Sequence, residues 1–187
     1  MHDLQTITAL GGTTPRVDTF DHITISENDG LALATVAAHL GQEDACKAHI
    51  KDLLGAVPGP DKVQLHDPEA GFWIGPDQWM IGAPKTTHEL LADMLKSRFG
   101  TTASITEQSG AWVTFDVQGP AMEDLCERLC NIPIRQMQSG DARRTVIHKM
   151  TCFVTRRAAH DHLRILGPRS SAKTLHHALI TAAKSVA

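Results

Sequence analysis

The stretch Phe72–Gly82, which reads FWIGPDQWMIG, decides how the first half of this chain folds. It places two of the three tryptophans on either side of a Gly-Pro-Asp sequence. The tetrapeptide GPDQ predicts a β-turn, because Pro76 at the second turn position already has the φ angle that the turn requires. The short apolar segments on both sides therefore predict a β-hairpin that pairs Ile74 with Trp79 and Phe72 with Ile81.

Both faces of this predicted hairpin are apolar. Side chains alternate between the two faces of a strand. Trp73 and Met80 share one face, and the other face carries Phe72, Ile74, Trp79 and Ile81. A single layer of helices covers only one face of a sheet. The second face must therefore be covered by the other half of the chain, which is the simpler explanation, or by another protein.

The composition of the 187 residues is that of a folded protein, with 42% hydrophobic and 21% charged residues. The net charge is -3, and no basic face alternates with aromatic residues, so we expect no nucleic-acid partner. No apolar run approaches the roughly eighteen residues of a membrane span, and the N-terminus lacks a signal-peptide pattern. The four cysteines form no C-x-x-C pair. These features predict a cytoplasmic protein without disulfides and without a membrane partner.

The first half of the chain predicts the element order β-α-β-β-α-β. Residues 1–20 are rich in Thr and Gly and are expected to form an N-terminal arm without regular structure. A strand over 31–37 is followed by a helix that ends at Gly55. After the hairpin, Thr86 and Glu89 are spaced as a capping box for a helix over 87–99, and a strand follows over 101–107. This order is that of a ferredoxin-like sandwich.

The second half predicts a similar order with a different sequence. The segment AWVTFDVQ (111–118) alternates as a strand, and the next segment has an amphipathic helical stripe formed by Met122, Leu125, Cys126, Leu129 and Cys130. TVIHKMTCFVTRR (145–157) and HLRIL (162–166) are each expected to form one strand, and a final helix follows, with an apolar face formed by Leu175, Ala178, Leu179, Ala182 and Ala183. The fold class is therefore α+β, with two ferredoxin-like βαββαβ-type halves, 21–107 and 108–187, packed together in one compact domain (21–187).

The His and Cys residues that could bind a metal do not have both the spacing and the number of ligands that a metal site needs. His176 and His177 are adjacent on a helix, where a shared ligand pair would need a spacing of three or four residues. His160 and His162 have no third ligand nearby in the sequence. The pair Cys126 and Cys130 has a suitable spacing but lies on the apolar stripe, so buried thiols are the better interpretation. We therefore expect no metal site in this chain.

Catalytic and phosphate-binding motifs are also not found. Neither of the two glycine-rich phosphate motifs follows a predicted strand, and no G-x-S-x-G sequence occurs. Arginines at Arg143-Arg144, Arg156-Arg157 and Arg169 could hold an anionic ligand. Solvated surface charge is the simpler explanation for them. The sequence thus predicts no catalytic residue and no cofactor-binding residue in this chain.

Four short motifs carry a resemblance to a known family. They are ALGG..PR at 9–16, the WIGPDQW segment at 73–79, QS.AW at 108–112 followed by a strand and Gly-Pro, and PRSSAKTL at 168–175. In this order they resemble the gamma subunit of heterotetrameric sarcosine oxidases over nearly the whole chain. The residues that carry these motifs and are candidates for contacts with partners are Trp73, Gly75, Pro76, Asp77, Trp79, Trp112, Arg169 and Ser170. Glu107 and Ser171 stand where the family more often has Asp and Phe.

The resemblance implies a role in a complex of four different chains. Such a complex oxidatively demethylates sarcosine to glycine, with formation of 5,10-methylenetetrahydrofolate and hydrogen peroxide. FAD, FMN, NAD, zinc and tetrahydrofolate are expected on the partner alpha, beta and delta subunits. For this chain the resemblance implies a structural role and the fold of folate-binding aminomethyltransferases without their active site.

Two alternatives stay open. One is the equivalent subunit of an N-methylglutamate dehydrogenase complex, which has a subunit of similar type. The other is a stand-alone folate-binding or aminomethyl-transferring enzyme, which would need a buried carboxylate to hold the pterin. The acids near the motifs are Asp77, Glu107 and Asp116.

Overall fold

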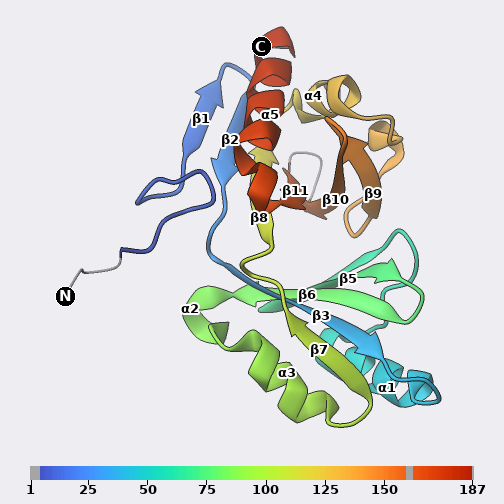
Figure 1. The fold of residues 1–187 in the computed structure, drawn as a ribbon. Helices are drawn as coiled ribbons and strands as arrows, with labels where there is room; N and C mark the ends of the chain where they lie inside the picture. Colours follow the sequence, from blue (N-terminus) through green and yellow to red (C-terminus); the bar gives the residue numbers. More distant parts are fainter. Residues whose placement is uncertain (1–4, 159–161, 187) are drawn as a thin grey trace. The chain divides into compact units, whose positions relative to one another are not determined.

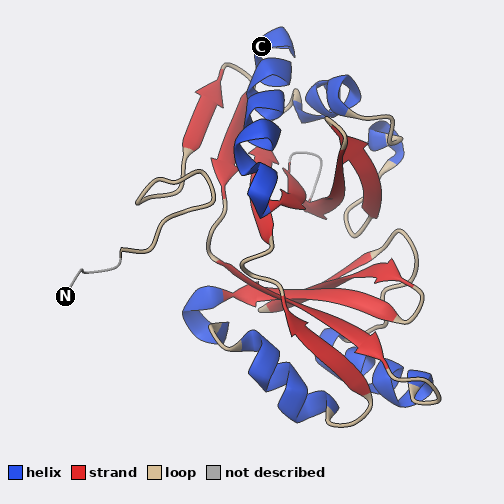
Figure 2. Ribbon diagram, viewed as in Figure 1, coloured by secondary structure: helices blue, strands red, loops and turns tan. Residues whose placement is uncertain are grey.

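Two antiparallel sheets and the helices packed on them organise the chain, as the computed structural model of residues 5–158 and 162–186 shows (Figures 1 and 2). The chain divides into two compact units. Unit 1 comprises Met1–Asp29, Ala111–Ser139 and Arg143–Ala187, and unit 2 comprises Gly30–Gly110 and Gly140–Ala142. The predicted α+β class is confirmed.

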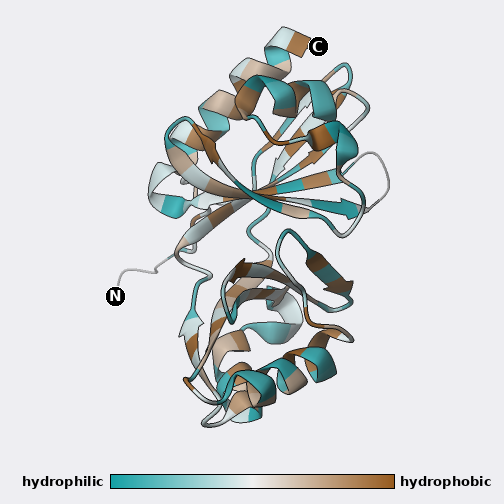
Figure 3. Cartoon of the chain, turned by 90° about the vertical axis from the view of Figure 1, so that its right-hand side faces the viewer, coloured by the Kyte–Doolittle hydropathy of each residue, from teal (hydrophilic) through white to brown (hydrophobic). Residues whose placement is uncertain are grey.

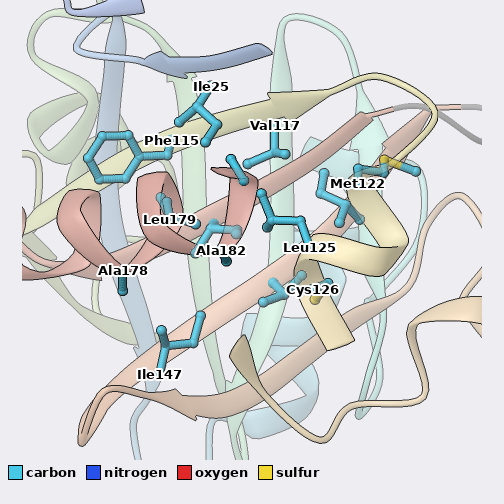
Figure 4. Packing of buried hydrophobic residues seen from close by; sticks show 14 of the residues in the cluster. Ile25, Phe115, Val117, Met122, Leu125, Cys126, Ile147, Ala178, Leu179 and Ala182 are labelled. Carbon is cyan, nitrogen blue, oxygen red and sulfur yellow. The ribbon is translucent and has the colours of Figure 1, made fainter. Parts of the chain in front are cut away.

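Unit 1 contains a six-stranded sheet with two helices on one face. The strand order is β1 (Val17–Phe20), β2 (Ile23–Glu27), β8 (Trp112–Gln118), β11 (His162–Pro168), β10 (Met150–Ala158) and β9 (Ala142–Ile147). The helices α4 (Met122–Leu129) and α5 (Ala172–Val186) contact each other, and two 3-10 turns, η1 (Ile134–Gln136) and η2 (Arg169–Ser171), precede β9 and α5. Figure 4 shows the apolar core that helices and sheet form together, including Ile25, Phe115, Val117, Leu125 and Leu179.

Unit 2 contains a five-stranded sheet in the order β4 (Val63–His66), β5 (Glu69–Gly75), β6 (Gln78–Pro84), β3 (Leu31–Ala38) and β7 (Ala103–Glu107). The helices α1 (Glu43–Leu54) and α3 (Leu91–Phe99) share a second apolar core with this sheet, and the short α2 (Lys85–His88) precedes α3. Figure 3 shows hydrophobic and hydrophilic residues alternating along the strands and helices of each unit, as half-buried elements require.

The strongest periodic patterns predicted their elements correctly. The expected stripe of α5 is buried throughout, with Leu175 and Leu179 completely inaccessible to solvent. Helix α1 ends as predicted, because Gly55 adopts a left-handed conformation with φ of 77° at its C-terminal cap. On β8, the inward positions Val113 and Phe115 are buried in the core of unit 1.

The expectation of an unstructured N-terminal arm over residues 1–20 is wrong at its C-terminal end. Residues Val17–Phe20 form β1, which pairs with β2, and Thr8 further upstream is buried. Strand β2 pairs in turn with β8, so residues before Asp29 complete the sheet of the second half of the chain. The predicted pair of sequential βαββαβ halves is therefore not confirmed, although the change of unit near residue 110 lies close to the expected boundary after residue 107.

Two further predictions treated as one element a segment that forms two. The helix expected over 87–99 is split into α2 and α3, and no side chain caps α2, so the capping box of Thr86 and Glu89 does not form. The expected single strand over 145–157 is a hairpin of β9 and β10, because His148 and Lys149 both adopt positive φ angles of 46° and 67°. Such a two-residue turn is usually signalled by Asn-Gly or Asp-Gly, and this turn has His148 and Lys149 in their place.

The hairpin of FWIGPDQWMIG forms, but its register differs by one residue from the prediction. Trp73 pairs with Trp79 and Phe72 pairs with Met80, because a bulge lies between Trp73 and Gly75. A bulge inserts one extra residue into one strand and shifts every pair beyond it. Trp73 therefore joins Trp79 on the helix-covered face, and Phe72 joins Met80 on the other.

Both faces of this hairpin are apolar, as the sequence indicated. Phe72 and Met80 are buried at 6% and 1% exposure, although neither belongs to the core that α1 and α3 cover. Leu33 and Val63 are likewise buried outside that core. That the other half of the chain or another protein covers this second face stays a prediction.

Candidate functional site

The Gly-Pro-Asp turn of the most specific motif has a well-defined structural role. Asp77 adopts a left-handed conformation with φ of 51°, which a type II turn requires at its third position and which Asp tolerates better than most residues. Its carboxylate lies 2.7 Å from Lys47 Nζ of α1, and its carbonyl accepts the N–H of Ala38 at 3.0 Å. The turn between Gly75 and Gln78, including Pro76, is thereby tied to both a helix and a neighbouring strand.

The two tryptophans of this motif contribute to the core of unit 2. Trp79 is only 2% exposed, and its indole N–H donates a hydrogen bond of 2.9 Å to the carbonyl of Pro58. Trp73 is half-buried and packs against the same core. Trp79 is thus a core residue within its own unit.

The remaining motif residues meet at one end of the sheet of unit 1. Trp112 pairs with Pro168 across β8 and β11, and its ring lies 5.5 Å from that of Phe153. Arg169 donates its backbone N–H to Ala111 O at 2.9 Å and its guanidinium to Ile7 O at 3.2 Å. Ser170 is exposed in the turn that leads into α5. Two motifs that are far apart in the sequence thus contact each other here, and Arg169 also reaches Ile7, which lies just before the first motif.

A buried carboxylate that the sequence analysis missed holds the first motif in place. Glu27 is 4% exposed, and its two carboxylate oxygens accept the backbone N–H groups of Leu10 at 2.9 Å and Arg16 at 3.2 Å. Its own N–H donates to Arg16 O at 2.7 Å. The available signal was the alternation of β2, in which Ile23, Ile25 and Glu27 share one face.

A second carboxylate, Asp116, is part-buried and lies on the face of the unit 1 sheet opposite the helices. Arg164 contacts it through two nitrogens, with Nε 2.7 Å from Oδ1 and Nη2 3.0 Å from Oδ2. Asn28 Nδ2 donates to Oδ2 at 2.6 Å, and His162 Nε2 lies 3.1 Å from Oδ1. Strands β8 and β11 place Asp116 directly opposite Arg164, and Asn28 follows β2.

These contacts keep Asp116 ionised. Burial by itself raises the pKa of this carboxyl, but hydrogen bonds from His162 and Arg164, the positive charge of Arg164 and the amide of Asn28 together hold the pKa well below its usual range. A carboxylate has about four lone-pair sites for hydrogen bonds. The four contacts of Asp116 therefore occupy its acceptor capacity with groups of its own chain.

The other two acids considered for ligand binding also have partners within the chain. Asp77 pairs with Lys47, as described above. Glu107 is exposed, and its Oε1 accepts the N–H of Ser109 at 2.8 Å. Of the three acids, only Asp116 is a part-buried residue on a sheet face.

Arg156, which the sequence analysis interpreted as surface charge, is buried instead. Arg156 is 2% exposed and donates to the carbonyls of Ile134 and Met137 and to the carboxylate of Glu123, 2.7 Å away. It stabilises the segment around η1, which makes it unsuitable as an anion-binding residue. His176 is part-buried, and its Nε2 lies 2.7 Å from Asp18 Oδ2, which links α5 to β1. His177 is exposed.

The cysteines are all free thiols. Of the two thiols predicted to be buried, Cys126 is buried and Cys130 is only half-buried at the end of α4. Cys46 and Cys152 are also buried. Within residues 5–158 and 162–186, no group of three or more His, Cys, Asp or Glu residues is placed to hold a metal ion. His160 of the histidine pair lies outside the described residues, and His162 contacts Asp116.

Over the same described residues, no helix has the length and apolar character that a membrane crossing needs.

No protein-family model matches the chain, and no curated protein sequence matches it. Solved structures do match its fold. A chain of the heterotetrameric sarcosine oxidase from Corynebacterium sp. U-96, in complex with pyrrole 2-carboxylate, superposes with a TM-score of 0.76 at 21% identity, covering 88% of this chain and 85% of that one. The glycine cleavage system aminomethyltransferase T from Bartonella henselae superposes with a TM-score of 0.63 at 17% identity, covering 85% of this chain and 45% of that one.

Proposed function

We propose that this chain is a non-catalytic structural subunit of a heterotetrameric sarcosine oxidase, as the resemblance stated above implies at the level of sequence motifs. The fold is that of a chain of such an oxidase and of part of an aminomethyltransferase. The observation that carries the proposal is the extent of the first match, which covers 88% of this chain and 85% of the oxidase chain. A chain of the oxidase therefore shares this fold over most of its length.

The match to the aminomethyltransferase covers only part of that enzyme. This chain spans less than half of that enzyme's length, because the match covers 45% of it. The folate and one-carbon chemistry of such enzymes is thus linked to this chain through the fold. In the proposed complex, the chemistry belongs to the other chains: FAD, FMN, NAD, zinc and tetrahydrofolate are bound by alpha, beta and delta partners in the cytoplasm.

The surroundings of Asp116 argue against the stand-alone folate-binding enzyme. A carboxylate that holds a pterin must accept hydrogen bonds from the ligand's N–H groups. Asp116 already accepts from Asn28, His162 and Arg164, so a pterin would have to displace at least one of them. Leaving Arg164 without its partner in a part-buried position would be costly. These residues do not fit a tetrahydrofolate site.

The assembly is tested by purifying the tagged full-length chain from its native cells. An eluate of four different chains with a flavin absorbance spectrum and sarcosine-dependent peroxide formation is the expected result. Turnover of N-methylglutamate by a four-chain eluate, without peroxide, would instead support the dehydrogenase subunit. A colourless single chain would contradict both assemblies. As a second measurement, co-expression with the flavin-bearing chains should raise the soluble yield above that of this chain expressed alone.

Titration calorimetry of the isolated chain with tetrahydrofolate tests the enzyme alternative. We expect no heat of binding at micromolar concentrations. Micromolar binding that is lost in Asp116→Asn would place the pterin at that carboxylate and would favour the enzyme. The exposed acid Asp93, which pairs with Lys96 at 3.2 Å, offers the matched control Asp93→Asn.

A further inference from the structure

Two thiols lie in contact at the C-terminal end of α4. The Sγ atoms of Cys126 and Cys130 are 3.7 Å apart, and Cys130 Sγ lies 3.6 Å from the carbonyl oxygen of Cys126. Cys126 is completely buried in the core of unit 1, whereas Cys130 is half-buried and reaches the surface. The pair therefore combines one thiol that a small reagent can reach with one that only its neighbour can reach.

The position of the pair at a helix end matters for its chemistry. Residues four apart within a helix have Cβ atoms about 5–6 Å apart, which is more than the roughly 3.5–4.5 Å that a disulfide tolerates. Cys130, however, lies outside the helix, with extended angles of φ -157° and ψ 169°. One backbone hydrogen bond of 3.1 Å, from Cys130 N–H to Cys126 O, ties it to the last turn. Opening a helix end costs little free energy, so the two sulfur atoms can approach each other.

The two thiols are also unequal in acidity. A hydrogen bond from Cys126 lowers the pKa of the Cys130 thiol below its usual value, and it does so against the opposing effect of burial. The same contact, together with burial, raises the pKa of Cys126. The first thiolate of the pair therefore forms on Cys130, which is the residue at the surface. A thiolate is the reactive form of cysteine toward peroxides.

The other cysteines of the chain do not share these properties. Cys46 and Cys152 are fully buried, and burial raises the pKa of each thiol to about 11. Within a single molecule they serve as natural controls, because they differ from Cys130 in both access and acidity.

We propose that Cys126 and Cys130 form a peroxide-reactive dithiol site that closes to an intramolecular disulfide. The Cys130 thiolate attacks one oxygen of hydrogen peroxide, the O–O bond breaks, and hydroxide leaves and takes up a proton to become water. Cys130 is then a sulfenic acid. The Cys126 sulfur attacks it, the S–O bond breaks, and a second water leaves with the Cys126 proton. Two thiols are thus oxidised by two electrons, and one peroxide is reduced to two waters.

The test uses the reduced full-length chain, treated with hydrogen peroxide and then blocked with N-ethylmaleimide. Trypsin cuts after Arg128, between the two cysteines, so a Cys126–Cys130 disulfide joins peptide 99–128 to peptide 129–135. We expect this linked pair to accumulate first, while Cys46 and Cys152 remain unmodified until the protein is denatured. Equal reactivity of Cys46 or Cys152 would overturn the proposal, and so would oxidation that yields only disulfides between molecules.

Two variants separate the roles of the thiols. Cys130→Ser should lower the rate of thiol oxidation at least about tenfold, because the remaining thiols are buried and protonated. In Cys126→Ser, Cys130 should still react but should remain a sulfenic acid that dimedone labels. Dimedone labelling as strong in the unmodified chain as in Cys126→Ser would show that Cys126 does not resolve the sulfenic acid. The peptide map of the unmodified chain keeps the test valid if either variant folds poorly. The test does not depend on the proposed assembly, because the peroxide is added.

Discussion

The indole N–H of Trp79 donates a 2.9 Å hydrogen bond to the carbonyl oxygen of Pro58 within the core of unit 2. This contact joins the strand after the Gly-Pro-Asp turn to the proline-rich segment that precedes β4. A tryptophan suits this position, because its ring fills the core and its one polar atom satisfies a buried carbonyl.

We expect Trp79→Phe to lower the free energy of unfolding by about 3 kcal/mol, because the smaller ring leaves a cavity and the Pro58 carbonyl loses its donor. Trp73→Phe is the matched control, since Trp73 is half-buried against the same core. Urea unfolding followed by circular dichroism measures both. A smaller loss for Trp79→Phe than for Trp73→Phe would contradict the assignment of Trp79 to the core.

Glu27 should be required for order in the N-terminal loop. In Glu27→Gln, the side-chain NH₂ replaces one of the two oxygens that accept the N–H groups of Leu10 and Arg16. One of these two backbone N–H groups then faces the side-chain NH₂, which is a donor and cannot accept its hydrogen bond. The loss in free energy of unfolding should be about 1–3 kcal/mol. Hydrogen exchange should become faster at these two amides, and proteolysis should increase within residues 8–16. Glu107→Gln, at an exposed carboxylate, should leave both measurements unchanged. If Leu10 and Arg16 were as protected in Glu27→Gln as in the unmodified chain, the two hydrogen bonds of Glu27 would not be what orders the loop.

Asp116→Asn should destabilise unit 1 by about 3 kcal/mol, because it leaves the charge of Arg164 without its partner in a part-buried position. The double variant Asp116→Asn with Arg164→Met should recover part of this loss, since both charges are then removed. With the single variant Arg164→Met and the unmodified chain, the four free energies of unfolding form a double-mutant cycle. Strict additivity of the two single losses would show that the pair is not coupled.

The same carboxylate predicts a dependence of stability on pH. The pKa of Asp116 is lower in the folded protein than in the unfolded chain, because Arg164 and His162 stabilise its charged form. Its contribution is therefore fully present above the ordinary carboxyl pKa of about 4 and is lost as the pH falls below that value. Unfolding measured between neutral and acidic pH should show a shallower acid loss for Asp116→Asn than for the unmodified chain. Parallel curves would rule out this contribution.

Gly119, just before α4, should tolerate no side chain. Its φ is +119°, and a Cβ atom there would lie 2.3 Å from the carbonyl oxygen of His22. Gly119→Ala must therefore strain the backbone and push β2 away, with an expected cost of about 3 kcal/mol or more. At Gly110 an added Cβ would meet nothing within 4 Å, so Gly110→Ala should change the melting temperature little. Similar melting temperatures for the two variants would contradict this account.

Local patterns predicted those elements in which the buried positions recur with the spacing of a helix or a strand. Helix α1 with its glycine cap, helix α5 and strand β8 were all evident from spacing, since one face of each meets an apolar core. The motifs also predicted the fold, which the match to a chain of the sarcosine oxidase confirms. The hairpin was correctly located from its turn, and its register was wrong because nothing local signals the bulge after Trp73.

The candidate site was less accessible from sequence. The arginine pairs looked like surface charge, yet Arg156 is buried against Glu123 and two backbone carbonyls. Glu27 was not recognised, and Asp116 was considered only as a ligand group. Their surroundings come from segments far apart along the chain, as in the contact between Asn28 and Asp116, 88 residues apart.

By itself, the sequence determined the α+β class, the positions of the periodic helices and strands and the motif pattern that resembles an oxidase subunit, because these depend on residue types at short spacings. Only the tertiary structure decided that β1 and β2 complete the sheet of β8. It also decided which charges are buried and that Cys126 and Cys130 contact each other at a helix end. Strand partners and burial depend on what packs against a segment, and that information lies in distant parts of the chain.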